Sequence, residues 1–135
     1  MTTNAIEFQI KTKKKQEFVF LDSQLEEILD QSGVQEGIML VYCPHTTGGI
    51  TINENADPDV RRDLSLGLNE TFPNKEAYVH MEGNSDGHMK SSVVGASETL
   101  IISNGHLILG TWQSVYFCEF DGPRTRTVYV KIIEG

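Results

Sequence analysis

Apolar and polar positions alternate near the N-terminus. Every second residue from Ile6 to Ile10 is apolar, and Phe18 and Phe20 repeat the pattern. Because successive side chains of a strand point to opposite faces of a sheet, these two stretches are predicted to be strands. The connection between them is basic at positions 13–15. We interpret it as a solvated turn, with contact to a phosphate as the alternative.

Two later stretches change to the three- and four-residue spacing of a helix. The first begins at a capping box made by Ser23 and Glu26 and ends at Gly33. The second begins with Asp57 as the N-cap and Pro58 in the first turn, where a missing N–H costs nothing. The two apolar stripes are Leu25, Ile28 and Leu29, and Val60, Leu64 and Leu68.

The remaining segments have the length and composition of strands. They occupy residues 37–43, 45–55, 98–103, 106–112, 114–120 and 125–133. Asn104 and Gly105 give the strongest hairpin signal, residues 121–123 form a further turn, and a brief helical turn is expected to end at Gly95. Mostly antiparallel sheets with two main helices predict a compact, single α+β domain over residues 1–135.

Composition narrows the class of protein. The net charge of −8 argues against nucleic-acid binding, which requires dense Lys and Arg. No apolar run approaches the roughly 20 residues that cross a bilayer, and the N-terminus lacks a secretory apolar segment. Cys43 and Cys118 are isolated in apolar runs, which is typical of reduced, buried thiols. We therefore expect a cytoplasmic protein without a membrane segment.

Histidines are the first candidates for chemistry. His45, His80 and His88 lie at or beside predicted loops, whereas His106 follows the hairpin turn and is expected to point to water. Neutral imidazole is the commonest metal ligand, and three protein ligands leave a fourth position open for catalysis. Spacing alone also allows surface or hydrogen-bonded histidines, so both interpretations stay open here.

Carboxylates supply the acid–base candidates. Glu54 has no predicted structural role, so it is a candidate general base or ligand of a divalent ion, against a plain loop acid. Asp57 can act in addition to capping its helix. Asp86 and Glu82 can fix the tautomers of the neighbouring histidines or only make the loop soluble.

Cationic and hydroxyl groups form a third set. Lys90 and Ser91 lie at a possible helix start, where free N–H groups, an ammonium and a hydroxyl suit a phosphate. Arg124 and Arg126 alternate after the last turn and are expected to share one face of a strand. Arginine on a strand is usually solvated, so the pair alone is a weak indication.

Trp112 and Gln113 place a large aromatic ring beside an amide. Core packing explains the tryptophan, and the glutamine is less easily explained. Both belong to LILGTWQSVYFCEFDGPR, which follows HTTGGITINENADPDVRRDL and YVHMEGNSDGHMKSSVVG in the chain. From His45 to Arg126 these stretches resemble the YjbQ-type family, often described as secondary thiamine-phosphate synthases.

The resemblance implies a compact α+β fold that assembles as a homotrimer, with pockets near subunit boundaries. It also implies that His45, His80 and His88 hold a divalent metal, with zinc expected and magnesium as the alternative. Other polar positions of the family motifs are Glu54, Asp57, Lys90, Gln113 and Arg124.

The activity attached to the family joins a pyrimidine diphosphate to a thiazole phosphate and releases pyrophosphate. The leading expectation is therefore a metal-dependent enzyme on a phosphorylated small molecule, a transferase that makes thiamine phosphate as its main or side activity. Its expected catalytic residues are Glu54, Asp57, Asp86 and Gln113. Its expected substrate-binding residues are Lys90, Ser91, Trp112, Arg124 and Arg126. The alternatives are a metal-dependent hydrolase of a phosphorylated or carbonyl substrate and a non-catalytic ligand-binding trimer.

Aromatic residues of the C-terminal strands bear on assembly. They are Tyr116, Phe117, Phe120 and Tyr129, and both faces of residues 114–120 look apolar. A strand covered on both sides suits either a central position in the core or a subunit contact. Both possibilities remain open at the level of sequence.

Overall fold

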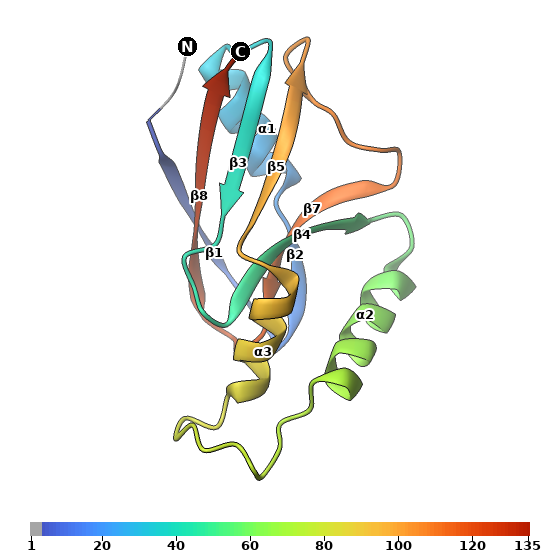
Figure 1. The fold of residues 1–135 in the computed structure, drawn as a ribbon. Helices are drawn as coiled ribbons and strands as arrows, with labels where there is room; N and C mark the ends of the chain where they lie inside the picture. Colours follow the sequence, from blue (N-terminus) through green and yellow to red (C-terminus); the bar gives the residue numbers. More distant parts are fainter. Residues whose placement is uncertain (1–3) are drawn as a thin grey trace.

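The computed structural model describes residues 4–135, which fold into two antiparallel sheets and three helices (Figure 1). The larger sheet has the strand order β1-β8-β3-β5-β6. Its strands are β1 (Ile6–Lys11), β8 (Thr125–Glu134), β3 (Gly37–Tyr42), β5 (Ser97–Ser103) and β6 (His106–Leu107). The smaller sheet has the order β2-β7-β4. Its strands are β2 (Glu17–Phe20), β7 (Gln113–Glu119) and β4 (Gly48–Glu54). The predicted compact α+β fold is confirmed.

Helix α1 (Asp22–Ser32) covers the core and α2 (Pro58–Thr71) stands at the side of the molecule (Figure 1). The start of α2 is as predicted, because Asp57 Oδ1 accepts a hydrogen bond from the backbone N–H of Asp59 at 2.9 Å. The capping box predicted for α1 is wrong. Its N-cap is Leu21, without a side-chain cap, and the carboxylate of Asp22 accepts from the N–H of Val115 instead.

Helix α3 (Ser85–Val94) replaces the brief helical turn predicted before Gly95. Its ten residues lack an apolar stripe, and the residues it buries are Asp86, Gly87 and Lys90. Since apolar periodicity is the main sequence signal of a helix, a helix that buries charge and glycine gives no such signal.

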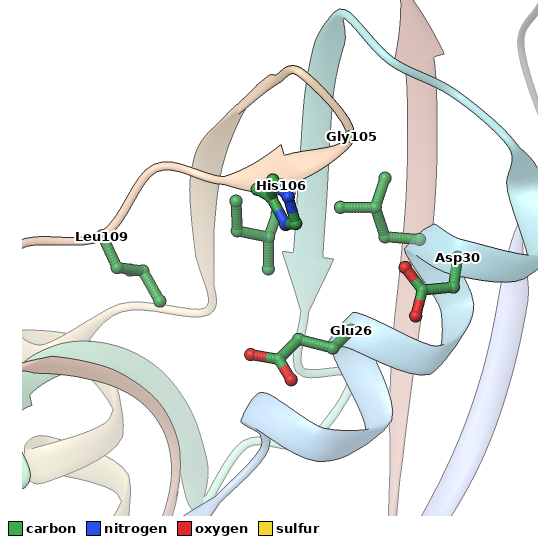
Figure 2. A pocket seen from close by; sticks show the side chains of 7 residues that line it. Glu26, Asp30, Gly105, His106 and Leu109 are labelled. Carbon is green, nitrogen blue, oxygen red and sulfur yellow. The ribbon is translucent and has the colours of Figure 1, made fainter.

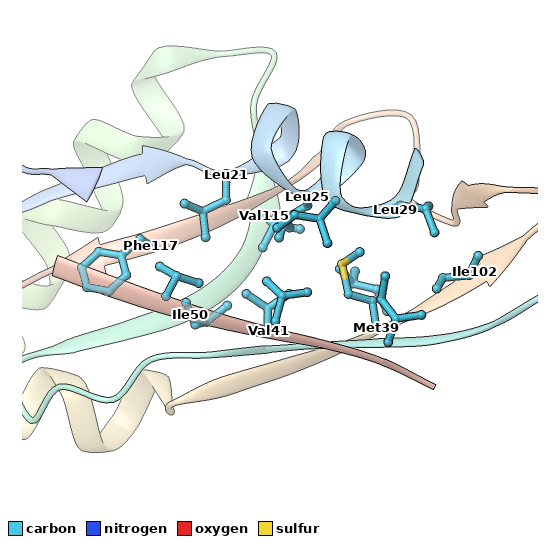
Figure 3. Close-up of a cluster of buried hydrophobic side chains, with 14 of the residues drawn as sticks. Leu21, Leu25, Leu29, Met39, Val41, Ile50, Ile102, Val115 and Phe117 are labelled. Carbon is cyan, nitrogen blue, oxygen red and sulfur yellow. The ribbon is translucent and has the colours of Figure 1, made fainter. Parts of the chain in front are cut away.

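The apolar core lies between α1 and the two sheets (Figure 3). Leu25 and Leu29 of α1 point toward Met39 and Val41 of β3. Complete burial of one such side chain contributes roughly 1.5–3 kcal/mol to stability. The aromatic residues Tyr116, Phe117 and Phe120 are also fully buried within the chain. Core packing therefore explains these three, and of the four aromatic residues only Tyr129 is substantially exposed.

The sequence predicted two reduced, buried thiols and no membrane segment. Cys43 and Cys118 are free and buried, as predicted. Burial raises the pKa of both thiols, which keeps them protonated. No helix of residues 4–135 has the length and apolar content to cross a membrane.

Candidate functional site

A polar pocket of about 360 Å³ lies where the loop after β3, the start of α3 and the turn between β7 and β8 meet. We call it the histidine pocket. Its lining consists of His45, His80, His88, Thr46, Thr47, Arg124 and Arg126, with Pro44, Glu82 and Asn84. The structure thus brings together all three histidines and both arginines that the sequence singled out, from segments far apart in the chain.

Glycines allow the backbones around the histidine pocket to approach closely. A Cβ on Gly87 would lie 2.9 Å from the backbone oxygen of Phe120, so the first turn of α3 rests against the end of β7. A Cβ on Gly49 would lie 2.7 Å from the backbone oxygen of Gly95, at the other end of α3. Both distances are shorter than a Cβ atom tolerates. Only glycine at these positions therefore allows α3 to pack this closely against β4 and the end of β7.

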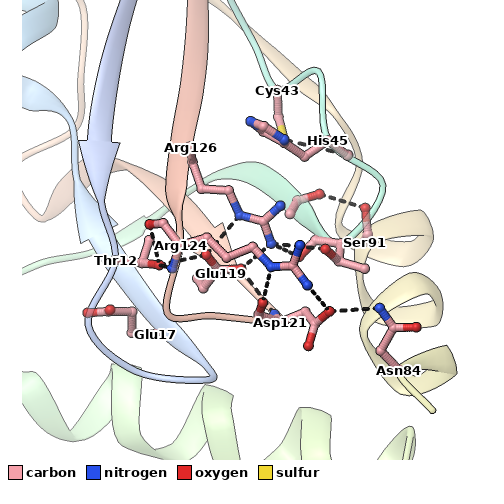
Figure 4. Close-up of polar contacts among 12 residues, drawn as sticks. Thr12, Glu17, Cys43, His45, Asn84, Ser91, Glu119, Asp121, Arg124 and Arg126 are labelled. Carbon is pink, nitrogen blue, oxygen red and sulfur yellow. Dashed lines mark hydrogen bonds and ion pairs between the residues drawn. The ribbon is translucent and has the colours of Figure 1, made fainter. Parts of the chain in front are cut away.

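Arg126, which lines the pocket, is held by a network of buried polar contacts (Figure 4). Its guanidinium forms two hydrogen bonds with the carboxylate of Glu119, one of them 2.8 Å long, and a third of 2.9 Å with Thr47 Oγ1. The hydroxyl of Thr12 also donates to Glu119, at 2.7 Å. Arg126 and Glu119 are 3% and 0% exposed. This arginine supports the floor of the pocket, and its charge is already neutralised.

The carboxyl of Glu119 stays ionised in this network. Burial alone would raise its pKa. Hydrogen bonds from Arg126, Thr12 and the backbone N–H of Asp121 outweigh burial, and the pKa lies below its ordinary value. A charged pair this deep in the protein makes each partner dependent on the other.

Arg124 lies at the mouth of the pocket, about half exposed. Its Nε donates to the backbone oxygen of Asp121 at 2.6 Å and its Nη2 to the carboxylate of Asp121 at 2.7 Å. The same carboxylate accepts from Asn84 Nδ2 at 2.7 Å, which ties the arginine to the N-cap of α3 (Figure 4). A guanidinium has five N–H donors, so three remain for a ligand.

His45 has a fixed tautomer. Its Nε2 accepts a hydrogen bond of 2.9 Å from the backbone N–H of Thr127, so the neutral ring carries its proton on Nδ1. Burial lowers the pKa of His45, and the nearby positive charge of Arg126 lowers it further. His45 is therefore a neutral ring that lines the pocket and carries its N–H on Nδ1.

His80 and His88 form a pair of rings that also line the pocket. Their ring centroids lie 5.1 Å apart and the rings are nearly perpendicular, at 88°. His88 is carried by α3, and His80 by the exposed loop before it. The two rings present their nitrogens from two different segments of the chain.

Asp86, Lys90 and Ser91 do not line the histidine pocket. Lys90 is 2% exposed, and its ammonium donates to Gln16 Oε1 at 2.7 Å and Asn69 Oδ1 at 2.6 Å. Asp86 Oδ2 lies 3.6 Å from the ammonium. Burial lowers the pKa of Lys90, and Asp86 opposes this shift. Ser91 Oγ donates to the backbone oxygen of Gly48 at 2.6 Å. Lys90 and Ser91 therefore join α3 to neighbouring segments, whereas Asp86 pairs with Lys90 within α3.

The remaining predicted residues lie at the other end of the smaller sheet. Glu54 is opposite Gln113 in the β4–β7 register, whereas Gly48 is opposite Glu119 beside the pocket. Six residues of strand, about 20 Å, separate these ends. Asp57 caps α2 nearby. Trp112 is 61% exposed, so the expectation that it packs in the core is wrong. None of these four side chains lines the histidine pocket.

Sequence reasoning missed Glu119, Thr47 and Asn84. Glu119 had a usable signal, because a carboxylate inside the apolar stretch 114–120 requires a buried cation as its partner. Thr47 and Asn84 gave no comparable signal. Asn84 Oδ1 is buried without a hydrogen-bond partner among the described residues, although the amide nitrogen is engaged.

A second pocket, of about 290 Å³, lies between α1 and the β5–β6 hairpin (Figure 2). His106 lines it together with Glu26 and Asp30. The side chain of His106 is exposed, which confirms its predicted position. This pocket shares no lining residue with the histidine pocket, so the fourth histidine is separate from the other three.

Relatives of known sequence match almost the whole chain. The chain is 56% identical over 126 residues to the UPF0047 protein YugU of Bacillus subtilis, covering 93% of this chain and 96% of the relative. It is 52% identical to the UPF0047 protein MJ1081 of Methanocaldococcus jannaschii, covering 93% and 91%.

Solved structures agree in fold. An uncharacterised YjbQ/UPF0047 protein of Clostridium acetobutylicum has a TM-score of 0.93 and 53% identity, covering 95% of this chain and 99% of that one. A protein of Sulfolobus solfataricus, described as of unknown function, has a TM-score of 0.93 and 27% identity over the full length of both chains.

The expected zinc-dependent transferase that makes thiamine phosphate is wrong, and so is the metal-dependent hydrolase offered as its alternative. These relatives are described only by their family or as of unknown function, and none of the descriptions gives an activity. Residues 4–135 contain no group of three or more His, Cys, Asp or Glu side chains that can hold a metal ion. The Nε2 lone pair of His45 is already used by Thr127. The side chains present therefore do not fit the expected three-histidine centre.

The family predicted from the motifs is confirmed. The model of the UPF0047 protein YjbQ-like family matches residues 6–135, which includes the first strands and α1 outside the motifs. The chain belongs to the UPF0047 YjbQ-like family.

Proposed function

We propose that the histidine pocket binds a small molecule through an oxyanion, either a carboxylate or a phosphate. The observation that carries the proposal is an excess of hydrogen-bond donors over acceptors in one polar pocket. Three N–H groups of Arg124 and the Nδ1–H of His45 have no acceptor among the described residues. The hydroxyls of Thr46 and Thr47 add two further donors. The charged oxygens of an oxyanion are hydrogen-bond acceptors, so they complement this lining.

The charges of the pocket favour a single anionic group. Arg124 and Arg126 are each paired with a carboxylate, so the arginines contribute donors more than net positive charge. Among the described residues, Glu82 supplies the one carboxylate that lines the pocket. It can accept a hydrogen bond from a hydroxyl or amine elsewhere on the ligand. A polyanion gains little from such a lining.

Removal of the Arg124 side chain tests the proposal. Titration of inorganic phosphate and of acetate, followed on the backbone amide signals of Thr46 and Thr47, gives the affinity and distinguishes the two oxyanions. We expect Arg124→Ala to weaken binding about tenfold or more, the loss of one charge-assisted hydrogen bond. Arg62→Ala removes the same charge on α2, outside the pocket, and is expected to leave these signals unchanged. Equal affinity in Arg124→Ala and the unaltered protein contradicts the proposal.

A further inference from the structure

Positive charge is concentrated at a place remote from the histidine pocket. The chain has 11 Lys and Arg residues and a net charge of −8. Five of the 11 lie in two short segments, residues 13–15 between β1 and β2 and residues 61–62 on α2. The two segments face each other across a cleft of about 390 Å³. We call it the basic cleft, and the side chains that matter in it are Lys14, Gln16, Phe18, Arg61, Arg62 and Ser65. It shares no lining residue with the histidine pocket.

The walls of the basic cleft are fixed to each other. Gln16 Nε2 donates to both the backbone oxygen and the hydroxyl of Ser65, each at 3.0 Å. Gln16 Oε1 accepts from the buried ammonium of Lys90 at 2.7 Å. The β1–β2 connection is thereby attached to α2 and α3 at once, although it was predicted to be a solvated turn. A cleft held open in this way needs little ordering when a ligand binds.

The cations of the cleft are available to a ligand. The Arg61 guanidinium lies 4.9 Å from the centre of the Phe20 ring and donates to the Tyr116 hydroxyl at 3.3 Å, so its direction is fixed. Neither Arg61 nor Lys14 forms an ion pair with a described residue. Arg62 lies 3.4 Å from Asp63, but both side chains are at least 71% exposed, so this pair is weak.

One carboxylate also lines the cleft. Glu17 accepts hydrogen bonds from the backbone N–H groups of Lys13 and Lys14. Its charge is therefore held by the turn between β1 and β2, and no described arginine or lysine pairs with it. The cleft keeps a surplus of positive charge after Glu17 is counted.

We propose that the basic cleft binds a small molecule that carries a phosphate or diphosphate group. Guanidinium groups and an ammonium from two sides, with the hydroxyl of Ser65 between them, suit the several oxygens of such a group. The partly buried Phe18 ring forms an apolar wall for the remainder of the molecule. The volume is that of a small-molecule site. A nucleic acid would meet the net charge of −8 beyond the cleft, so we favour a small ligand.

Inorganic diphosphate is the probe for this proposal, observed on the backbone amides of Gln16 and Ser65. We expect these signals to shift saturably. Arg62→Ala and Lys14→Ala are each expected to weaken the interaction about five- to tenfold, the loss of one charged contact. Both side chains are exposed, so neither change threatens the fold. Arg124→Ala, with the same loss of charge in the histidine pocket, is expected to leave the affinity at Gln16 and Ser65 unchanged.

Three results overturn the proposal. The first is that the amides of Gln16 and Ser65 do not move. The second is that they move equally in Arg62→Ala, or without saturation, as expected of general ionic screening. The third is that a single-stranded oligonucleotide binds more tightly than diphosphate, which assigns the cleft to nucleic acid. Because the histidine pocket is observed through other residues, failure at one site leaves the other site testable.

Discussion

Individual buried charges determine how the floor of the histidine pocket is built. Glu119 and Arg126 are both almost fully buried and hydrogen bonded to each other, with Thr12 bonded to Glu119 and Thr47 bonded to Arg126. The sequence presented Arg126 as a candidate ligand-binding residue. The structure gives it a partner that explains its burial and leaves the exposed Arg124 to meet a ligand.

Glu119→Gln tests this arrangement. The amide keeps the shape of the carboxyl but leaves Arg126 as a buried charge without its counter-charge, so we expect a loss of about 3 kcal/mol of unfolding free energy at neutral pH. Urea unfolding measures it. Glu76→Gln, at an exposed position, is the matched control and is expected to change stability by less than about 0.5 kcal/mol. Equal stability of Glu119→Gln and the unaltered protein would contradict the proposed role of the pair.

The effect of Glu119→Gln on the unfolding free energy is expected to depend on pH. The pKa of Glu119 is lower in the folded protein than in the unfolded chain. Its contribution to stability is therefore present above the unfolded value and is lost as the pH falls through the folded value. We expect the difference in unfolding free energy between the unaltered protein and Glu119→Gln to shrink over that acidic window. A difference that stays constant down to acid unfolding would refute this linkage.

At the scale of elements, the position of α3 depends on close backbone contacts more than on apolar packing. Gly87 lies in its first turn against the backbone oxygen of Phe120, at a distance that excludes a methyl group. Gly67 in α2 is also helical, but nothing lies within 4 Å of the position its Cβ would take. Substitution of the two glycines therefore distinguishes the effect of helix propensity, present at both positions, from the effect of the tertiary contact, present only at Gly87.

Alanine at each glycine gives opposite expected results. Gly67→Ala is expected to stabilise the protein by about 0.5–1 kcal/mol, because alanine is the better helix former. Gly87→Ala is expected to destabilise it by about 1–3 kcal/mol despite the same gain, because α3 must move away from β7. Thermal unfolding of the two variants measures both. Stabilisation by Gly87→Ala would show that α3 is not held by this contact.

The helix ends that were predicted correctly are those set by residues adjacent in the sequence. Asp57 and Pro58 begin α2 as expected, and Gly33 ends α1 in the left-handed conformation that favours glycine. The predicted start of α1 was wrong because Asp22 accepts a hydrogen bond from Val115 of β7. The two residues are 93 positions apart, so no local sequence pattern indicates this bond. Helix α3 was missed for a related reason, since its buried face consists of polar and glycine residues.

The histidines and arginines of the histidine pocket were predicted, but its chemistry was not. His45, His80 and His88 do line one pocket, which the family motifs indicated. The sequence did not show that a backbone N–H already occupies the ring nitrogen of His45. The sequence also suggested that Glu54 lies near the histidines. The distance between Glu54 and the pocket depends on how β4 pairs with β7, and the sequence does not give this register.

At the scale of the whole molecule, one face of the larger sheet is uncovered. Its exposed apolar side chains are Ile38, Leu40, Tyr42, Ile101, Tyr129 and Ile133. In the register, Ile38 lies between Ile101 and Ile133, so these side chains form a continuous row. Contiguous apolar surface of this kind is typical of a protein interface. The homotrimer expected from the family resemblance stays a prediction, and this face is the surface on which it depends.

Light scattering tests the homotrimer. We expect a mass of three chains of 15.1 kDa each. Ile38→Lys places a charge in the middle of the apolar row and is expected to shift the mass toward one chain, whereas Leu66→Lys, an exposed leucine on α2, is expected not to. A single-chain mass for the unaltered protein, or a trimer that survives Ile38→Lys, would exclude assembly through this face.

We infer that His45, His80 and His88 line one anion-binding pocket while His106 lies apart. Imidazole signals in NMR spectra report on each ring separately, and titration with inorganic phosphate is the most direct test. We expect saturable shifts of the His45, His80 and His88 signals at a common affinity, with the His106 signal unmoved. Absence of any shift, or equal and unsaturating shifts of all four rings, would contradict it.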